Sequence, residues 1–262
     1  ATLKLYPLPA AQLTAWAAVP SMEAAVQLLG LAHQRLGPGL TGFEVMGQFA
    51  LSLVDKHYPQ LRVPLWQNTP WCVLLENSDS ENESHARGQF ESLLEAALEA
   101  GCVSDAVVAE NLTQARGLWH IRESITLAQV QEGLNIKHDI SIPVYLIPAF
   151  VAETDALLAR EVPGVRMVDF GHLGDGNLHY NVQAPEGADG KAFLQDFEDK
   201  VNTLVFDQVL KFKGSISAEH GVGELKAAKL PHYKDPTALA MMRAVKKALD
   251  PKNILNPGRV LT

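Results

Sequence analysis

The sequence predicts an α+β fold in which a largely antiparallel sheet is covered by helices. Runs of period-2 or β-branched residues alternate with runs of helical spacing, and neighbouring strands follow the order of hairpin-linked, split β-α-β units. The 262 residues are 47% hydrophobic and 20% charged, which gives core enough for one large domain or two small ones. A doubly wound parallel sheet is the second alternative.

Seven runs are predicted as strands because apolar or β-branched residues recur in them at alternate positions or continuously. They cover residues 13–19, 42–46, 71–76, 103–109, 136–142, 166–173 and 177–183. Most of these runs are separated by a helical stretch, and the last two follow each other directly. This order is ferredoxin-like, and it favours split β-α-β units over simple parallel crossovers.

Seven helices are predicted from 3.6-residue periodicity and from terminal signals. Ser21 is the expected N-cap of the first helix, with Glu23 in its first turn, and Gly101 and Gly133 are expected to end the third and fourth helices. The predicted helices cover residues 21–36, 48–57, 84–100, 113–131, 148–160, 191–212 and 236–249.

Charge and cysteine content exclude several classes of protein. With 22 Lys and Arg against 30 Asp and Glu, the net charge is −8, so the sequence predicts no nucleic-acid partner. Cys72 and Cys102 each lie in an apolar, strand-like run, so we expect core thiols in a reducing compartment, the cytoplasm, rather than a disulfide framework.

The apolar segments are too short for a membrane anchor. The longest, residues 140–151, is interrupted by Pro143 and Pro148 and falls well below the roughly 20 residues that span a bilayer. The first residues include neither an initiator Met nor the pattern of a signal peptide, so we expect the chain to be part of a longer one. The glycine spacing at 37–42 matches a dinucleotide fingerprint, but it follows a helix instead of a strand, and we reject it.

The most informative segment is residues 169–182, which reads as a hairpin. Asp175-Gly176 is typical of a two-residue type I′ turn. That turn predicts that His172 pairs with His179, with Cβ atoms about 4.5–5.5 Å apart, and that Asn181 lies on the same face. Leu173, Leu178, Tyr180 and Val182 would form the apolar opposite face. An ordinary cross-strand histidine pair is the alternative, but two facing imidazoles on a polar face favour metal binding or catalysis.

A second segment, residues 214–223, places Glu219 and His220 between glycines, where the backbone can approach another group closely. Two histidines with one carboxylate form a ligand set for a catalytic metal that keeps positions open for substrate. Zinc is favoured, with manganese or iron(II) as alternatives. His220 would then be free to act as a general base. The structural alternative is a glycine-rich turn with a surface acid.

A third segment carries cationic groups suited to an anionic substrate. Arg122 and Thr126 are four residues apart on a predicted helix and share a face, and a guanidinium can grip a carboxylate with two parallel hydrogen bonds. Lys137, at the start of a predicted strand, could add a second positive charge. The alternative is a solvated helix face.

Three ordered motifs make the chain similar to a known family. They are GHLGDGNLH at 171–179, SAEHGVG at 217–223 and LDPKNILNPGRV at 249–260. Together they resemble the C-terminal half of the FAD-linked oxidases, the group that includes D-lactate dehydrogenase, the glycolate oxidase flavin subunit and D-2-hydroxyglutarate dehydrogenase. The resemblance extends over nearly the whole chain.

The resemblance implies that residues 1–262 form a substrate-binding domain that closes over FAD, with the N-terminal FAD-binding domain absent from this chain and supplied in cis or in trans. It implies His172, His179 and Glu219 as metal ligands and His220 as the base beside the flavin. Arg122, Thr126, Lys137 and Asn181 match substrate-contacting positions of the D-2-hydroxyglutarate dehydrogenases, which favours a dicarboxylate. Asn256 and Arg259 lie in the tail that approaches the flavin in this family, and a homodimer is compatible with it.

The expected activity is therefore oxidation of a D-2-hydroxy acid to the 2-keto acid, assisted by a metal and with hydride transfer to FAD. Without the flavin domain we expect the isolated chain to be inactive. Two other functions would use the same His, His and Glu set. A metal-dependent hydrolase would act without flavin, and a non-catalytic module would bind a hydroxy acid or a metal without turnover.

Overall fold

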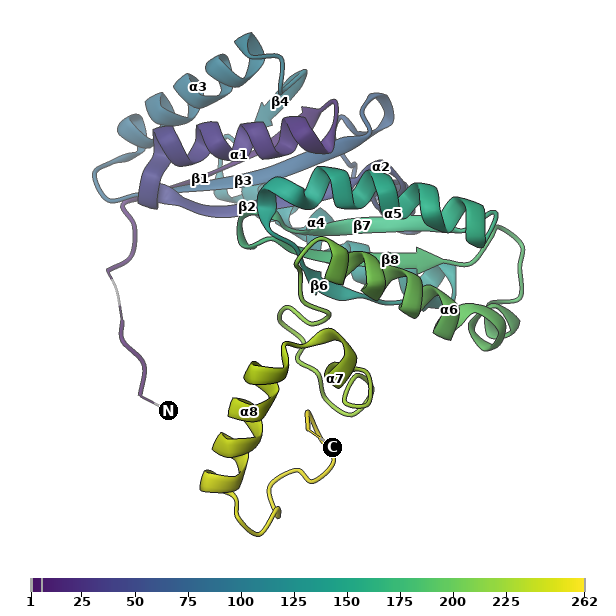
Figure 1. The fold of residues 1–262 in the computed structure, drawn as a ribbon. Coiled ribbons are helices and arrows are strands. Elements are labelled where there is room, and N and C mark those ends of the chain that lie inside the picture. The colour runs from purple at the N-terminus through teal and green to yellow at the C-terminus, as the bar shows by residue number, and fades with distance from the viewer. Residues whose placement is uncertain (1, 6, 262) are drawn as a thin grey trace.

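An eight-stranded sheet organises the fold in the computed structural model, which describes residues 2–5 and 7–261 (Figure 1). The strands are β1 (Ala11–Val19), β2 (Leu40–Gly47), β3 (Trp71–Asp79), β4 (Asp105–Val108), β5 (Asn135–Ile136), β6 (Asp139–Ser141), β7 (Arg166–His172) and β8 (Asn177–Gln183). Every strand pair in the described chain is antiparallel. The predicted α+β class is therefore confirmed, and the parallel alternative is wrong.

The α-helices of the described residues are α1 (Met22–Leu36), α2 (Gln48–His57), α3 (Glu83–Glu99), α4 (Leu112–Glu132), α5 (Ile147–Glu161), α6 (Gly190–Lys211), α7 (Leu230–Tyr233) and α8 (Pro236–Leu249). Helices α1 to α5 lie in the connections between strands, helices cover the sheet from the front and from behind, and α6, α7 and α8 follow the last strand (Figure 1). The Ser21 hydroxyl accepts a hydrogen bond from the Ala24 N–H, as its predicted N-cap role requires.

The strand order contains the predicted split β-α-β units. The sheet runs β4-β1-β3-β2-β7-β8-β5, and β6 also pairs with β8. Helix α1 joins β1 to β2 with β3 lying between them, and α5 joins β6 to β7 with β8 between them. The sheet thus consists of two such units side by side, and they meet where β2 pairs with β7.

Each face of the sheet is covered by its own apolar core. Residues of α1, α3, α5 and α6 form one core, and residues of α2 and α4 form the other. In β1, Ala15 and Ala17 belong to the first core, whereas Trp16 between them belongs to the second. Because successive side chains of a strand point to opposite faces, burial on both sides explains why β1 reads as a continuous apolar run.

Two predicted strands are shorter in the structure. The run at 103–109 pairs only over β4, and the run at 136–142 divides into β5 and β6. The division lies at Lys137 and His138, where the backbone N–H of His138 donates to the side-chain oxygen of Asn181 at 3.0 Å. A side-chain acceptor thus takes the place of a backbone partner at this point.

The predicted turn and register of the β7–β8 hairpin are wrong. Phe170 pairs with His179, so the register differs by two residues from the expected pairing of His172 with His179. The chain turns through a 3-10 helix (Leu173–Asp175), and Gly176 closes it in the left-handed region at φ 71°. A Cβ on Gly176 would lie 2.3 Å from the carbonyl oxygen of Ile142, so this close approach also requires glycine. A shift of two residues preserves the faces of a strand, so both histidines remain on one side.

The segments at the two ends of the chain lie away from the sheet (Figure 1). After α6, a bridge between Ser141 and Ser215 attaches the chain to β6, and α7, α8 and the C-terminal tail follow. None of the helices in the described residues has the length and apolar character needed to cross a membrane.

Candidate metal and substrate site

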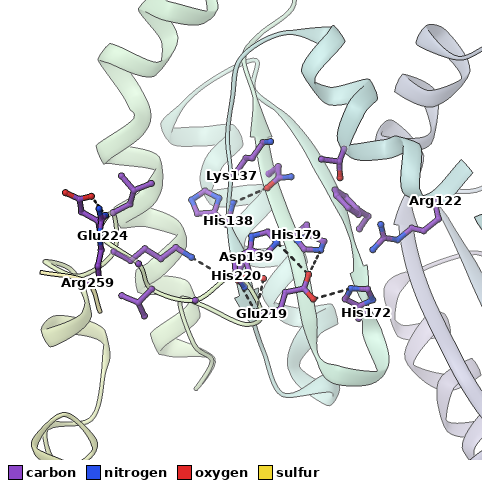
Figure 2. A pocket seen from close by; sticks show the side chains of 18 residues that line it. Arg122, Lys137, His138, Asp139, His172, His179, Glu219, His220, Glu224 and Arg259 are labelled. Atoms are coloured by element: carbon purple, nitrogen blue, oxygen red, sulfur yellow. Dashed lines mark hydrogen bonds and ion pairs between the residues drawn. The ribbon is translucent and has the colours of Figure 1, made fainter. Parts of the chain in front are cut away.

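A cavity of about 650 Å³ opens beside the second half of the sheet, and charged side chains line it (Figure 2). Its walls come from α4, the β5–β6 link, β7, β8 and the loop that follows the Ser215 bridge. The predicted site residues among its lining are Arg122, Thr126, Lys137, His172, His179, Asn181, Glu219, His220 and Arg259. The fold therefore assembles in one cavity the three segments that the sequence singled out.

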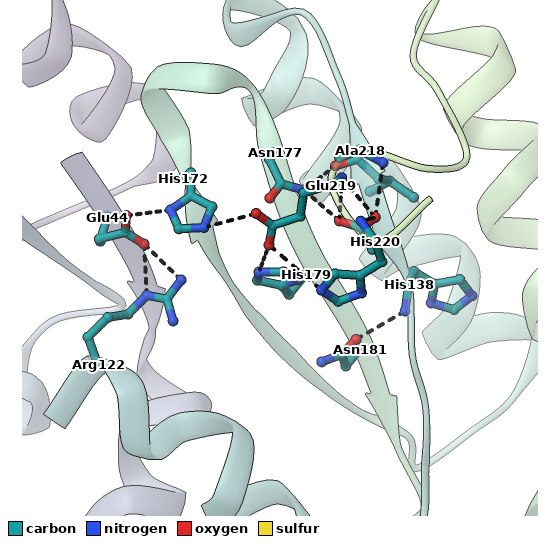
Figure 3. A network of polar contacts seen from close by, with 12 residues as sticks. Glu44, Arg122, His138, His172, Asn177, His179, Asn181, Ala218, Glu219 and His220 are labelled. Atoms are coloured by element: carbon teal, nitrogen blue, oxygen red, sulfur yellow. Dashed lines mark hydrogen bonds and ion pairs between the residues drawn. The ribbon is translucent and has the colours of Figure 1, made fainter. Parts of the chain in front are cut away.

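The Glu219 carboxylate lies between the two imidazoles of the hairpin (Figure 3). Its Oε2 is 3.6 Å from His172 Nε2, and its Oε1 is 3.3 Å from His179 Nε2. Two ligands bound tetrahedrally at about 2.1 Å from one zinc ion would lie about 3.4 Å apart. Each of these two separations therefore fits a pair of ligands on one divalent ion, and the nitrogen and oxygen donors suit zinc, manganese or iron(II).

Asp139 belongs to a group of four side chains, His179, Glu219, His220 and Asp139, whose potential ligand atoms all lie within 4.8 Å of one another, and His172 lies outside this group. The Asp139 carboxylate is already engaged by the backbone. Oδ2 accepts the N–H groups of Ala218, Glu219 and His220 at 3.0, 3.1 and 2.9 Å. Burial raises the pKa of Asp139, but the donated hydrogen bonds, first that of His220, outweigh it and lower the pKa. Asp139 thus shapes the loop that presents Glu219.

His220 is exposed in the cavity, with 65% of its side chain accessible. Its ring stacks on that of His179 with centroids 5.4 Å apart, and its Nε2 lies 3.7 Å from Glu219 Oε1. An exposed imidazole beside the three candidate ligands can exchange a proton with a molecule in the cavity. This placement is compatible with the predicted role of a base.

The two hairpin histidines have different electrostatic surroundings. Burial, reinforced by the positive charge of Arg122, lowers the pKa of His179 to about 4, so this imidazole is neutral at pH 7. The hydrogen bond to Glu44 raises the pKa of His172. Burial raises the pKa of Glu44. The hydrogen bond with His172 and the positive charge of Arg122 lower it by more, so the net effect is a lowered pKa.

Arg122 is held rigidly at the wall of the cavity. Its Nε donates to Oε2 of Glu44 at 2.8 Å, its Nη2 forms an ion pair with the same oxygen at 2.8 Å, and its guanidinium carbon lies 4.8 Å from the centre of the Phe170 ring. Thr126, one helical turn away, and the exposed Lys137 also line the cavity. The structure thus brings together the cationic groups that the sequence assigned to an anionic substrate.

Asn181 lies at the cavity but is bonded within the protein. Its Oδ1 accepts from the backbone N–H of His138 at 3.0 Å, and its Nδ2 donates to Gln129 Oε1 at 2.9 Å. It is buried, so in this structure it orders the cavity wall.

Of the two predicted flavin-side residues of the tail, both line a groove beside α8, and only Arg259 also lines the cavity. Arg259 lines the cavity and pairs with the carboxylate of Glu224, and the N–H of Val260 donates to Gly223 O at 2.7 Å. Asn256 lies in the groove, which also includes Met241 and Leu255. The structure does not bring Asn256 to the cavity.

Sequence reasoning missed Glu44 and Asp139. Glu44 interrupts the apolar run of β2, and a charged residue within a run predicted to be buried was a usable signal. Asp139 follows directly on Lys137-His138 and carried no comparable local signal. Its role depends on the loop of residues 218–220, which is distant in sequence.

The chain belongs to the C-terminal domains of the FAD-linked oxidases. The family model described as FAD linked oxidases, C-terminal domain, matches residues 8–260. The resemblance expected from the three motifs is therefore confirmed.

The relatives are named as dehydrogenases of 2-hydroxy acids. The chain is 38% identical to D-2-hydroxyglutarate dehydrogenase, mitochondrial, of Arabidopsis thaliana, over 90% of this chain and 40% of the relative. It is 36% identical to D-2-hydroxyglutarate dehydrogenase of Xanthomonas citri, over 99% of this chain and 53% of that relative. It is 33% identical to a putative mitochondrial D-lactate dehydrogenase of Schizosaccharomyces pombe, over 95% of this chain and 48% of that relative. The chain therefore spans about half the length of these relatives.

The fold is shared with solved structures of much lower sequence identity. A crystal structure of p-cresol methylhydroxylase with substrate bound superposes with a TM-score of 0.69 at 11% sequence identity, and it covers 97% of this chain and 53% of that chain. At this identity the likeness concerns the fold alone.

Proposed function

We propose that this chain is the metal- and substrate-binding part of a FAD-dependent dehydrogenase that oxidises a D-2-hydroxy acid to the 2-keto acid. The observation that carries the proposal is the convergence of His172, His179 and Glu219 beside a cavity that also holds Arg122 and His220. Membership of the FAD-linked oxidase family and the names of the relatives support it.

The substrate class follows from the charges of the cavity. Arg122 and Lys137 offer two separate cationic groups, so a substrate with two carboxylates, such as D-2-hydroxyglutarate, satisfies both, whereas D-lactate satisfies one. We therefore propose a dicarboxylic D-2-hydroxy acid, with D-lactate as the weaker ligand. Thr126 lies within the same wall and would contribute a hydroxyl to substrate binding.

The residues of this chain bind the substrate and move its proton. Arg122 and Lys137 hold carboxylate groups, and His220 accepts the proton of the substrate hydroxyl at Nε2. When bound, a divalent metal at His172, His179 and Glu219 would polarise the hydroxyl and one carboxylate oxygen, and FAD would accept the hydride from Cα. His179 suits its role because an imidazole must be neutral to ligate a metal, and its pKa is about 4.

Flavin binding is proposed for the complete enzyme, in which a FAD-binding domain in cis or in trans covers this cavity. Arg259 lines the cavity from the tail and is the residue of this chain that we propose to face the flavin. Cys72 and Cys102 are buried and free, which suits the reducing conditions of the cytoplasm that we propose as its compartment.

The experiment that tests this function combines metal content with ligand binding. The purified chain is compared with the His172→Ala/His179→Ala variant and with a His33→Ala/His120→Ala control, which removes two exposed imidazoles outside the cavity. We expect about one zinc ion per chain in the wild type and the control, and none in the double ligand variant. D-2-hydroxyglutarate should bind the zinc-loaded chain more tightly than D-lactate.

Three results would contradict the proposal. Metal retained by the double ligand variant would place the ion elsewhere. Hydrolysis of an ester or amide by the zinc-loaded chain without flavin would favour the metal-dependent hydrolase instead. Hydroxy-acid binding without flavin reduction, once the FAD-binding half is added, would favour the non-catalytic module.

A further inference from the structure

Glu44 is a charged residue inside a buried strand, and it is 4% exposed. It lies on β2, directly opposite His172 on β7, at the place where the two halves of the sheet meet. Opposed residues in an antiparallel pair have Cβ atoms about 4.5–5.5 Å apart, so the carboxylate reaches the imidazole across the ladder. The position of Glu44 therefore follows from strand pairing between segments that are 128 residues apart.

Both carboxylate oxygens of Glu44 are used (Figure 3). Oε1 lies 2.5 Å from His172 Nδ1, and Oε2 accepts from Nε of Arg122 at 2.8 Å and forms an ion pair with its Nη2 at 2.8 Å. The guanidinium of Arg122 stays protonated in proteins, so the carboxylate beside it stays ionised and can only accept hydrogen bonds. It follows that His172 donates from Nδ1.

This direction of the hydrogen bond decides what His172 offers to the cavity. A neutral imidazole with its proton on Nδ1 has its lone pair on Nε2, and that atom faces Glu219 at 3.6 Å. A carboxylate behind a metal-ligating histidine fixes the tautomer and the ring orientation in this manner. Glu44 thus selects the form of His172 that can bind a metal.

The same carboxylate also orients Arg122. With Nε and Nη2 directed toward Glu44 and the guanidinium carbon 4.8 Å from the Phe170 ring centre, the plane of the fork is fixed. The remaining N–H groups on Nη1 and the outer edge of Nη2 are then free to bind a carboxylate in the cavity that Arg122 lines.

We propose that Glu44 is a positioning residue that aligns the candidate metal ligand His172 and the candidate substrate-binding Arg122 through one buried carboxylate. The inference rests on the proposed function, because it gives these two residues their roles. It adds that one carboxylate orients both the candidate metal ligand His172 and the candidate carboxylate-binding Arg122. A change at Glu44 should therefore alter both binding sites, although Glu44 is not among the residues that line the cavity.

The Glu44→Gln variant tests whether the Glu44 carboxylate selects the tautomer of His172 or only stabilises the fold by pairing with Arg122. The amide oxygen of Gln can serve Arg122, whose charge makes it the stronger donor, but the amide nitrogen then donates to His172 Nδ1. His172 would carry its proton on Nε2, where it blocks a metal. Glu132→Gln is the matched control, since Glu132 is a buried carboxylate bonded to Lys56, His57 and Arg166 away from this cavity.

The experiment records the ¹⁵N spectra of the histidine rings in the metal-free 262-residue chain, at a pH where they are neutral. The His172→Ala variant identifies the signals of His172. We expect the Nδ1–H form in the wild type and in Glu132→Gln, and a shift to the Nε2–H form in Glu44→Gln. Zinc affinity, measured against a competing chelator dye, should fall by roughly tenfold to a hundredfold in Glu44→Gln and change less than about twofold in Glu132→Gln.

The His172 tautomer and the zinc affinity test the role of Glu44 and the proposed metal site separately. A wild-type His172 in the Nε2–H form, or a Glu44→Gln variant with unchanged tautomer and zinc affinity, would overturn the role of Glu44. A wild-type chain that binds no zinc but shows the expected tautomer switch would overturn the metal site and leave the positioning role of Glu44 supported. A loss of folding stability alone would move neither the tautomer nor the zinc affinity of the folded molecules.

Discussion

At the scale of single residues, the three histidines of the cavity differ in what surrounds them. His179 is half-buried against Phe170, with ring centroids 4.8 Å apart, and His172 is bonded to Glu44, whereas His220 is mostly exposed. Imidazoles held by neighbouring side chains suit metal binding, because a ligand must keep one orientation. An exposed imidazole suits proton exchange, because it can reach a substrate and return the proton to water.

Because of this difference, we expect substitutions of His220 and of His179 to affect different steps: His220 the proton transfer, and His179 the binding of the metal. His220→Ala should leave zinc affinity within about threefold but slow substrate oxidation by 10²–10⁴-fold, the usual contribution of a general base. His179→Ala should lose zinc binding itself. Flavin reduction in the enzyme assembled with its FAD-binding half, alongside zinc titration of each variant, measures both effects. Equal loss of zinc in the two variants would contradict the assignment of His220 as base.

At the scale of elements, the loop that carries Glu219 and His220 is ordered by one carboxylate. The backbone N–H groups of residues 218–220 converge on Asp139, and the ammonium group of Lys226 donates to Ile216 O at 2.7 Å. A side chain of β6 therefore takes the place of a helix or a strand ladder for this loop. The preceding bridge between Ser141 and Ser215 brings the loop to β6.

Asp139→Asn should loosen this loop, because a neutral amide oxygen is a weaker acceptor of the three N–H groups than the charged Oδ2, and the amide nitrogen cannot accept the hydrogen bond that Asn177 donates to Oδ1. We expect faster hydrogen exchange at the amides of residues 218–220 and zinc affinity lowered by roughly tenfold. Asp250→Asn is the control, since Asp250 accepts the N–H groups of Ile254 and Leu255 in the tail. Exchange in the control should increase there and leave zinc affinity unchanged; an equal effect on zinc would refute a specific role for Asp139.

The end of α4 is tied to its neighbours by an ion cluster with a predictable pH response. Burial raises the pKa of Glu132, but hydrogen bonds from Lys56, His57 and Arg166 outweigh it and lower the pKa from 4.5 to about 2. A carboxyl with a lowered pKa in the folded state stabilises the fold above its unfolded pKa, and this stability is lost as the pH falls toward the folded value. The relevant window therefore extends from about pH 4.5 down to about pH 2.

Glu132→Gln should accordingly lower the free energy of unfolding by about 2 kcal/mol at pH 7, as expected for the loss of hydrogen bonds to a charged group. The difference from the wild type should shrink as the pH falls through this window, because the wild-type carboxyl then becomes neutral as well. Urea unfolding between pH 7 and the acid limit of the folded state measures it. A difference that is constant with pH would show that ionisation of Glu132 does not contribute.

The elements themselves were largely predictable from sequence, since periodicity and caps such as Ser21 are local properties. The turn after His172 was not, because the Asp-Gly pair has the composition of a two-residue turn, while the position of Gly176 is set by the distant carbonyl of Ile142. The candidate ligand set could be proposed from sequence because His172, His179 and Glu219 lie in short motifs whose residue types and spacing are read directly, and it stays a prediction. Glu44 and Asp139 could not be assigned, because they act through strand and loop contacts between remote segments.

At the scale of the whole molecule, the candidate site joins the two halves of the sheet. Glu44 and β2 belong to the first half, while His172 and His179 belong to the second, and β2 pairs with β7 at the junction. The loop of Glu219 and the tail of Arg259 close the cavity from a third direction. A ligand that contacts all of these parts binds the folded chain and not the unfolded one, so its binding free energy adds to the stability of the fold.

Zinc should therefore raise the melting temperature of the whole chain. At a free concentration 100 times its Kd, a ligand stabilises the fold by about 2.7 kcal/mol, and one kcal/mol corresponds to about 2–4 °C for a domain of this size class. We expect a shift of about 5–10 °C by calorimetry in the wild type and in His33→Ala/His120→Ala, and none in His172→Ala/His179→Ala.

D-2-hydroxyglutarate should add a further shift only when zinc is present, and a larger one than D-lactate at equal concentration, because its second carboxylate meets Lys137 or Arg122. Lys137→Met should remove the difference between the two acids without altering the shift caused by zinc. If D-lactate stabilised the zinc-loaded chain as much as D-2-hydroxyglutarate did, the cavity would have a single carboxylate subsite and the dicarboxylate assignment would be wrong.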